Sequence, residues 1–290
     1  VALAALGAGA RAAAALEPRS TPPPRSIPVE EMEWDDLSNT DVSKFGRLAL
    51  EFDRDDWRHA ETENYVLHFR RITEARKVAR ELEFNIWFVA STLGAGKDEY
   101  SRKGHAFIFE DEGEWMQFVG RAELPGWAAS VAIGDELFLN VRSRGNTRRF
   151  DSNLLAHEAT HAVVARIFPR QRWPLWLNEG FAEYIAAAGV AERKNQTLGR
   201  HLKDLDQAKL SLDDLLEADF YPESRSQITT YYQSCERVVR FLMLELSAAD
   251  FRTFVDNLLE TGDMESAVMA AYGEHIQSYN EFLENLEDYS

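Results

Sequence analysis

The chain has 290 residues, of which 45% are hydrophobic and 11% aromatic, so it can bury a core and is not disordered over most of its length. Its formal net charge of −17 argues against binding nucleic acid or anionic membrane surfaces, because both reward clustered lysine and arginine. The single cysteine, Cys235, excludes an intramolecular disulfide framework and a cysteine-based zinc knuckle.

Residues 1–16 form an alanine-rich, apolar segment that ends in small residues. The segment is too short to span a bilayer as a stable anchor, and it is typical of a signal peptide with cleavage near residues 13–15. The alternative is an alanine-rich tail. No later run of about 18 apolar residues occurs, so we expect an exported protein, periplasmic or extracellular, whose mature chain has no stable membrane span.

Residues 17–56 are rich in proline and then in acidic residues. Three consecutive prolines at 22–24 favour an extended backbone, so we expect a linker here rather than a part of the core.

Residues 57–150 alternate between strand and helix patterns, which predicts an α/β subdomain. A Gly-Asp pair at 134–135 separates two β-prone runs and predicts a hairpin. The expected strands are 65–69, 105–109, 128–133 and 136–141, and the expected helices are 73–93 and 112–119.

From residue 151 to residue 290 the apolar residues recur with a helical period and strand signals vanish. The expected helices of this subdomain are 152–168, 177–189, 192–208, 227–247, 249–261, 264–272 and 276–287. The sequence therefore predicts an α+β fold, in which a small mixed-sheet N-terminal half packs on a mainly α-helical C-terminal half. We expect the border near residue 150 and an active site in the cleft between the halves.

The chemistry lies just after this border, where residues 157–161 read His-Glu-Ala-Thr-His. On a helix, positions i and i+4 share a face, so the imidazoles of His157 and His161 can reach the same ion. Glu158 can lean over that ion without binding it, which is where a general base for a metal-bound water must lie. Chance alone produces this pattern often enough that the downstream sequence must decide.

The downstream tract 176–184 reads WLNEGFAEY. A catalytic zinc takes three protein ligands and keeps one position open. Glu179 is well placed to supply the third ligand from an antiparallel helix, since two intervening prolines can turn the chain back. Glu183, one helical turn later, could accept a hydrogen bond from the other nitrogen of a ligating histidine, although a solvated position is equally open to it.

HEATH followed by WLNEGFAEY resembles the gluzincin metallopeptidases, which carry HExxH and a downstream glutamate. The nearest match is the bacterial peptidase-MA-like group of exported proteins, and the aminopeptidase N family is more distantly similar. The resemblance covers residues 57–250 loosely and residues 150–185 specifically. Aminopeptidase N enzymes have one more residue between the second histidine and the glutamate. This chain is also far shorter and has no GAMEN-like loop, so aminopeptidase specificity is not implied.

The resemblance implies one Zn²⁺ ion on His157, His161 and Glu179, with Glu158 as base and proton shuttle. It also implies that a tyrosine on a later helix stabilises the oxyanion, and the tract Thr230–Ser234 offers Tyr231 for that role, with Tyr232 as the alternative. The hairpin resembles the edge strand on which such peptidases lay an extended substrate. The residues expected at that edge are Ala128, Ala129 and Ser130.

Plainer interpretations stand beside these. The two histidines could be ordinary hydrogen-bonded helix residues, and Glu179 a carboxylate favoured by the dipole of a helix N-terminus. Tyr231 and Tyr232 could be core aromatics. The remaining histidines have no partner spacing and are interpreted as structural or surface residues: His59, His68, His105, His201 and His275.

The sequence thus predicts a zinc-dependent metallohydrolase, most simply a peptidase with a peptide or protein substrate. Two alternatives stay open: a non-catalytic exported metal-binding scaffold or binding protein, and a metallohydrolase of a non-peptide amide or ester. A structural zinc usually has four protein ligands, whereas this sequence offers three together with Glu158, which favours the enzyme.

Overall fold

The computed structural model describes residues 21–126, 128–141, 151–202, 205, 210–222 and 224–289. The chain forms two compact units, residues 20–239 and residues 240–289. The division therefore does not fall near residue 150. Helix α4 (Ser152–Ile167), which follows that point, packs against α2 (Ile72–Thr92) and β5 (Ser130–Ile133), which precede it. The expected signal peptide lies outside the described residues.

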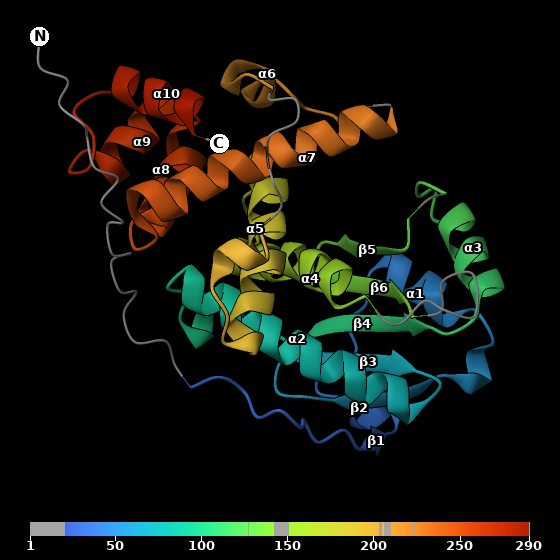
Figure 1. Cartoon of the computed structure of the whole chain (residues 1–290). Helices are drawn as coiled ribbons and strands as arrows, with labels where there is room; N and C mark the ends of the chain where they lie inside the picture. Colours follow the sequence, from blue (N-terminus) through green and yellow to red (C-terminus); the bar gives the residue numbers. More distant parts are fainter. Residues whose placement is uncertain are drawn as a thin grey trace, which may run out of the picture. The chain divides into compact units, whose positions relative to one another are not determined.

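One six-stranded mixed sheet forms the centre of the first unit (Figure 1). The strand order is β1-β2-β3-β4-β6-β5, in which β3, β4 and β6 are parallel and the remaining neighbours are antiparallel. The other strands are β1 (Glu31–Met32), β2 (Arg58–Glu61), β3 (Tyr65–Phe69), β4 (Gly104–Phe109) and β6 (Glu136–Asn140). The predicted strands and hairpin correspond to β3, β4, β5 and β6, and the α+β fold class is confirmed.

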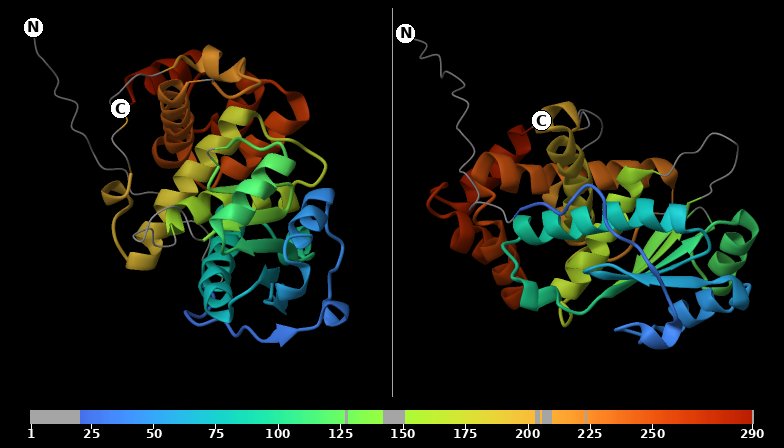
Figure 2. Two further views of the ribbon diagram at one scale, coloured as in Figure 1. Left: turned by 90° about the vertical axis from the view of Figure 1, so that its right-hand side faces the viewer. Right: turned by 90° about the horizontal axis from the view of Figure 1, so that it is seen from below.

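Different helices cover the two faces of the sheet, and α1 (Lys44–Leu50) and α2 lie on opposite sides of it (Figure 2). On one face, Phe107 and Phe138 of the sheet join an apolar cluster with residues of α1 and α3 (Glu112–Arg121). The other face meets α2 and α4. Helix α4 is thus packed between the sheet and other helices, which fixes the segment that carries HEATH.

The expected linker at 17–56 is wrong over most of its described part. Strand β1 pairs with β2, and α1 buries Ala49 in the apolar cluster. Ser43 caps α1 by accepting from the N–H groups of Phe45 and Gly46, and its own N–H donates to Glu136 of β6 at 2.6 Å. The acidic composition concealed a sparse set of apolar residues that reach the core.

Helix α4 begins where it was expected, because the Asp151 carboxylate accepts from the N–H groups of Asn153 and Leu154. Helix α5 (Leu175–Lys194) is longer than expected and ends at Asn195, which has a left-handed φ of 49°. The helix expected at 192–208 is therefore replaced by the end of α5 and a short 3₁₀ turn, and residues 203–204 and 206–209 lie outside the description. The remaining elements of this unit are η1 (Trp34–Asp36), η2 (Arg54–Asp56), η3 (Lys97–Tyr100), η4 (Leu198–Arg200), α6 (Leu212–Leu216) and α7 (Arg225–Arg240).

The second unit is helical. It contains the π-helix η5 (Phe241–Ser247), α8 (Phe251–Thr261), α9 (Met264–Tyr272) and α10 (Tyr279–Asp288). These elements correspond to the helices expected after residue 240, although the helix expected to run unbroken to residue 247 changes to π geometry at Phe241. Across the described residues, no helix combines the length and apolarity needed to cross a membrane.

Candidate metal centre

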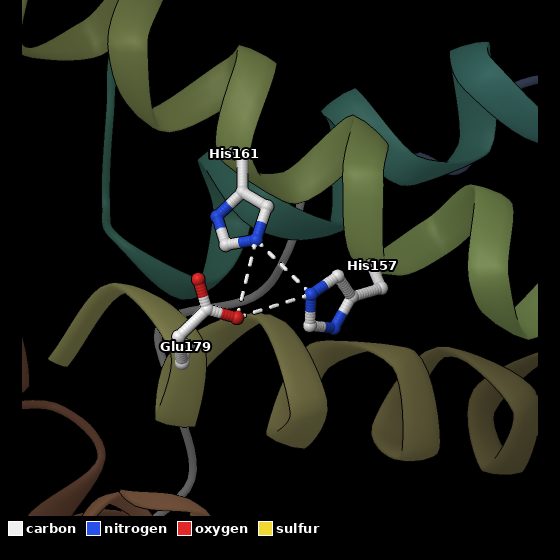
Figure 3. A group of neighbouring side chains, drawn as sticks. All are labelled: His157, His161 and Glu179. Carbon is white, nitrogen blue, oxygen red and sulfur yellow. Dashed lines mark hydrogen bonds and ion pairs between the residues drawn. The ribbon is translucent and has the colours of Figure 1, made fainter. Parts of the chain in front are cut away.

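His157 and His161 project from adjacent turns of α4 toward α5 (Figure 3). Their spacing of four residues brings both rings onto one helix face, and the two Nε2 atoms lie 3.1 Å apart. Two neutral imidazoles can share that contact only if one of them donates, or if a cation lies between them.

Glu179 of α5 closes a triangle with the two imidazoles (Figure 3). Its Oε2 lies 3.3 Å from His157 Nε2 and 3.6 Å from His161 Nε2. Ligand atoms held about 2.0–2.1 Å from a tetrahedral zinc lie about 3.3 Å from one another, so the triangle has the size of one face of a zinc coordination shell. Glu179 Oε2 is buried and accepts no hydrogen bond from the described residues, as expected of an atom that faces an ion. The three side chains therefore fit a zinc ion.

A second carboxylate of α5 supports the first histidine. Glu183 Oε1 lies 3.2 Å from His157 Nδ1, the nitrogen that faces away from the triangle. Burial disfavours the imidazolium, but Glu179 and Glu183 outweigh it and raise the pKa of His157 well above its ordinary value. The same imidazoles keep the pKa of Glu179 well below its usual range despite its burial. The expected place of Glu183 beside a candidate ligand is found.

Glu158 lies next to this triangle and is held by the sheet. The N–H of Ala132 in β5 donates to Glu158 Oε2 at 3.0 Å. Burial raises the pKa of Glu158, and the nearby imidazoles His157 and His161 oppose that shift. A carboxyl group with a raised pKa is better suited to accept and return a proton near neutral pH.

A cleft of about 470 Å³ opens over the triangle. Strand β5 forms one wall, and because β5 is the last strand of the sheet, its outer edge pairs with no other strand of the described residues. Of the residues expected at a substrate edge, Ala128 and Ser130 line the cleft, and strand β5 runs from Ser130 to Ile133. Ala129 instead accepts from Asn140 N–H on the β6 side.

Of the two tyrosines considered for the oxyanion, Tyr232 lines the cleft, with its ring centre 6.0 Å from that of His157. Tyr231 is only 1% exposed, so its ring lies within the core. Helix α7 carries both residues and comes very close to α5 at Gly180, where an added Cβ would lie 2.3 Å from the Cys235 carbonyl oxygen. The glycine that follows Glu179 thus lets α7 bring Tyr232 to the site.

A second tyrosine in the cleft was not expected from the sequence. Tyr221 lies in the segment before α7, and its hydroxyl donates to Glu179 Oε1 at 2.6 Å. The residue is in no regular element and 42 positions from its partner, so no periodic pattern marks it. The neighbouring Phe220 is 85% exposed.

Comparisons with known proteins do not identify a family for this chain. No model of a known protein family matches the chain, and no curated protein sequence matches it. The gluzincin resemblance therefore rests on the motif residues themselves.

Proposed function

We propose that this chain is a zinc-dependent hydrolase that cleaves peptide bonds. The observation that carries the proposal is the triangle of His157, His161 and Glu179, which has the dimensions of a zinc site. Glu158 lies beside it, and so does the edge of β5, which no other described strand pairs with. A zinc ion held there would act as a Lewis acid and lower the pKa of a water molecule. Three ligands leave a coordination position open, as catalysis requires.

Glu158 is the residue proposed to move the proton. Its Oε2 already accepts the Ala132 N–H, which leaves Oε1 to take a proton from the attacking water. The carboxylic acid then returns the proton to the leaving amine. Because the side chain is tied to β5, the base and the substrate would be aligned by the same strand.

The edge of β5 supports a peptide substrate. Ala132 directs its N–H away from β6 and toward Glu158, so this edge of β5 faces the site, and its other outward backbone groups could pair with an extended peptide added as a strand. Tyr232, which also lines the cleft, is the proposed donor to negative charge that develops on the carbonyl oxygen. Export to the periplasm or the exterior stays a proposal from the sequence.

The first test is cleavage of a mixed peptide library by the purified, zinc-loaded protein. We expect cleavage that is lost on chelation and reduced at least about 1,000-fold by Glu158→Gln with zinc still bound. Glu260→Gln makes the same chemical change on an exposed residue of α8 and should leave activity intact. If zinc-loaded protein cleaves no peptide but hydrolyses a simple ester or amide, the substrate class is wrong. If it hydrolyses nothing, a metal-binding scaffold is the better description.

A further inference from the structure

The two carboxylate oxygens of Glu179 have different partners, and Tyr221 is the partner of one of them. Its hydroxyl donates to Oε1 at 2.6 Å, while Oε2 faces the imidazoles at 3.3 and 3.6 Å. A distance of 2.6 Å is within the range of a charge-assisted O–H···O⁻ hydrogen bond, which is about twice as strong as a neutral one. The phenol therefore fixes which oxygen is presented to the ion.

Burial makes this bond important. The side chain of Glu179 is only 2% exposed, so water cannot readily replace the phenol at Oε1. Without that donor, the carboxylate could turn about its last bond and offer both oxygens to the ion, or leave one oxygen without a partner. Helix α5 sets the position of Glu179, whereas the hydrogen bond from Tyr221 sets the orientation of its carboxylate about the last side-chain bond.

We propose that Tyr221 is a positioning residue of the metal centre, which holds Glu179 so that it binds zinc through Oε2 alone. The inference rests on the proposed zinc site and extends it to a residue outside the motif. Single-oxygen binding leaves room for water and substrate in the coordination shell, which a carboxylate bound through both oxygens would fill. Tyr221 thus acts through Glu179, whereas Tyr232 is the tyrosine left to face the substrate.

Two features of Tyr221 suit this task. Its phenol O–H is a hydrogen-bond donor, and Glu179 Oε1 is the acceptor that lies within reach of it. Its ring also packs edge-on against Tyr232, with ring centres 6.3 Å apart, which orients the hydroxyl from the cleft side. Tyr221 is 50% exposed, so removing its hydroxyl leaves little unfilled space in the core.

The test measures zinc affinity by competition with a chromophoric chelator. We expect Tyr221→Phe to weaken zinc binding about 10–100-fold, the usual effect of removing a group that orients a ligand. Tyr231→Phe is the matched control, because it removes a hydroxyl from a buried tyrosine that has no place in the triangle. Phe220→Ala is the second control, because it alters the same segment without touching Glu179. Both controls should stay within about twofold of the parent protein.

The cobalt-substituted protein provides a second measurement. Cobalt in a four-coordinate site absorbs visible light more strongly than cobalt in a site of higher coordination number, so Tyr221→Phe should weaken the visible bands if Glu179 then binds through both oxygens. Unchanged affinity and an unchanged spectrum would overturn the inference, and so would an equal loss of affinity in Phe220→Ala. Failure of the parent protein to bind zinc would remove the metal centre itself. Zinc binding without hydrolysis would contradict only the proposed function.

Discussion

The protein contains two groups of neighbouring histidines: one lies beside buried carboxylates, and the other lies among aromatic rings. In the candidate metal centre, His157 lies within 3.3 Å of carboxylate oxygens from two glutamates of α5. In the sheet, one histidine from each of three neighbouring strands forms a chain: His59 Nδ1 lies 2.9 Å from His68 Nδ1, and His68 Nε2 lies 3.0 Å from His105 Nδ1. The neighbours of that chain include the rings of Trp34 and Phe107.

The carboxylates account for the difference. Next to Glu179 and Glu183 the pKa of His157 is raised, whereas burial lowers the pKa of His68 well below its ordinary value and that of His105 to about 4. Within the described ranges, only the helix-borne group brings three ligand atoms within 4.8 Å of one another. Close imidazoles alone do not make a metal site, because the ligand atoms must also converge on one point, as those of His157, His161 and Glu179 do.

The largest expected difference between the two groups is in zinc affinity. His157→Ala should weaken zinc binding about 100–1,000-fold, since roughly 3–4 kcal/mol is a single ligand's share of a typical zinc binding free energy. His105→Gln should leave it within about twofold. Chelator competition on both variants checks the contrast. It would disappear if His105→Gln lost as much affinity as His157→Ala, because the sheet histidines would then bind the ion as well.

The position of Tyr232 in the cleft depends on a close approach between α5 and α7. Gly180→Ala would place a Cβ 2.3 Å from the Cys235 carbonyl oxygen, so we expect the free energy of unfolding to fall by about 3 kcal/mol and Tyr232 to be displaced. Gly189→Ala, on the same helix, is the control: its Cβ would meet Phe84 at 3.6 Å, an ordinary contact. That change should be neutral or stabilising by up to about 1 kcal/mol. Equal denaturation curves for the two variants would contradict the packing described.

The same two groups show how far the sequence predicts the structure. HEATH and the glutamate after it are visible because a helix repeats every 3.6 residues and the ligands lie at fixed short spacings. The histidine chain could not be predicted, since His59, His68 and His105 meet only through the strand register, in which His59 pairs with His68 and His68 with Phe107. They are interpreted from the sequence as structural or surface residues, and His68 and His105 are indeed buried in the sheet, but the contacts among the three rings are not predicted.

Tyr221 was missed for a related reason. It reaches Glu179 from an irregular segment, and its position depends on how the chain returns to α7 rather than on any local pattern. The prediction of a linker at 17–56 was wrong for a different reason. The proline-rich and acidic composition outweighed a few spaced apolar residues, such as Val42 and Ala49, that reach the core. Periodic elements, including β3 and α4, were predicted to within a residue or two.

Acid should act on the sheet histidines through their lowered pKa values. Below the unfolded pKa of about 6.5 the unfolded chain binds protons that buried His105 does not bind until about pH 4, so stability that is present above pH 6.5 is lost as the pH falls. At pH 5 this residue alone should cost about 2 kcal/mol. Urea unfolding of metal-free protein at pH 7 and pH 5 measures the loss, which should be smaller by that amount in His105→Gln. An equal loss in both proteins would show that His105 is already protonated in the folded state.

The smallest expected effect concerns the N-terminus of α4. Asp151→Ala removes the carboxylate that accepts from Asn153 and Leu154, and loss of such a cap costs about 1 kcal/mol of stability. Asp151→Ser keeps a capping acceptor and should recover most of it. Zinc affinity should change little, because His157 lies beyond the first turn and is held by Glu179 and Glu183 of α5. A loss of affinity comparable to that of a ligand variant would mean that the helix start, rather than the carboxylates of α5, sets the geometry of the metal centre.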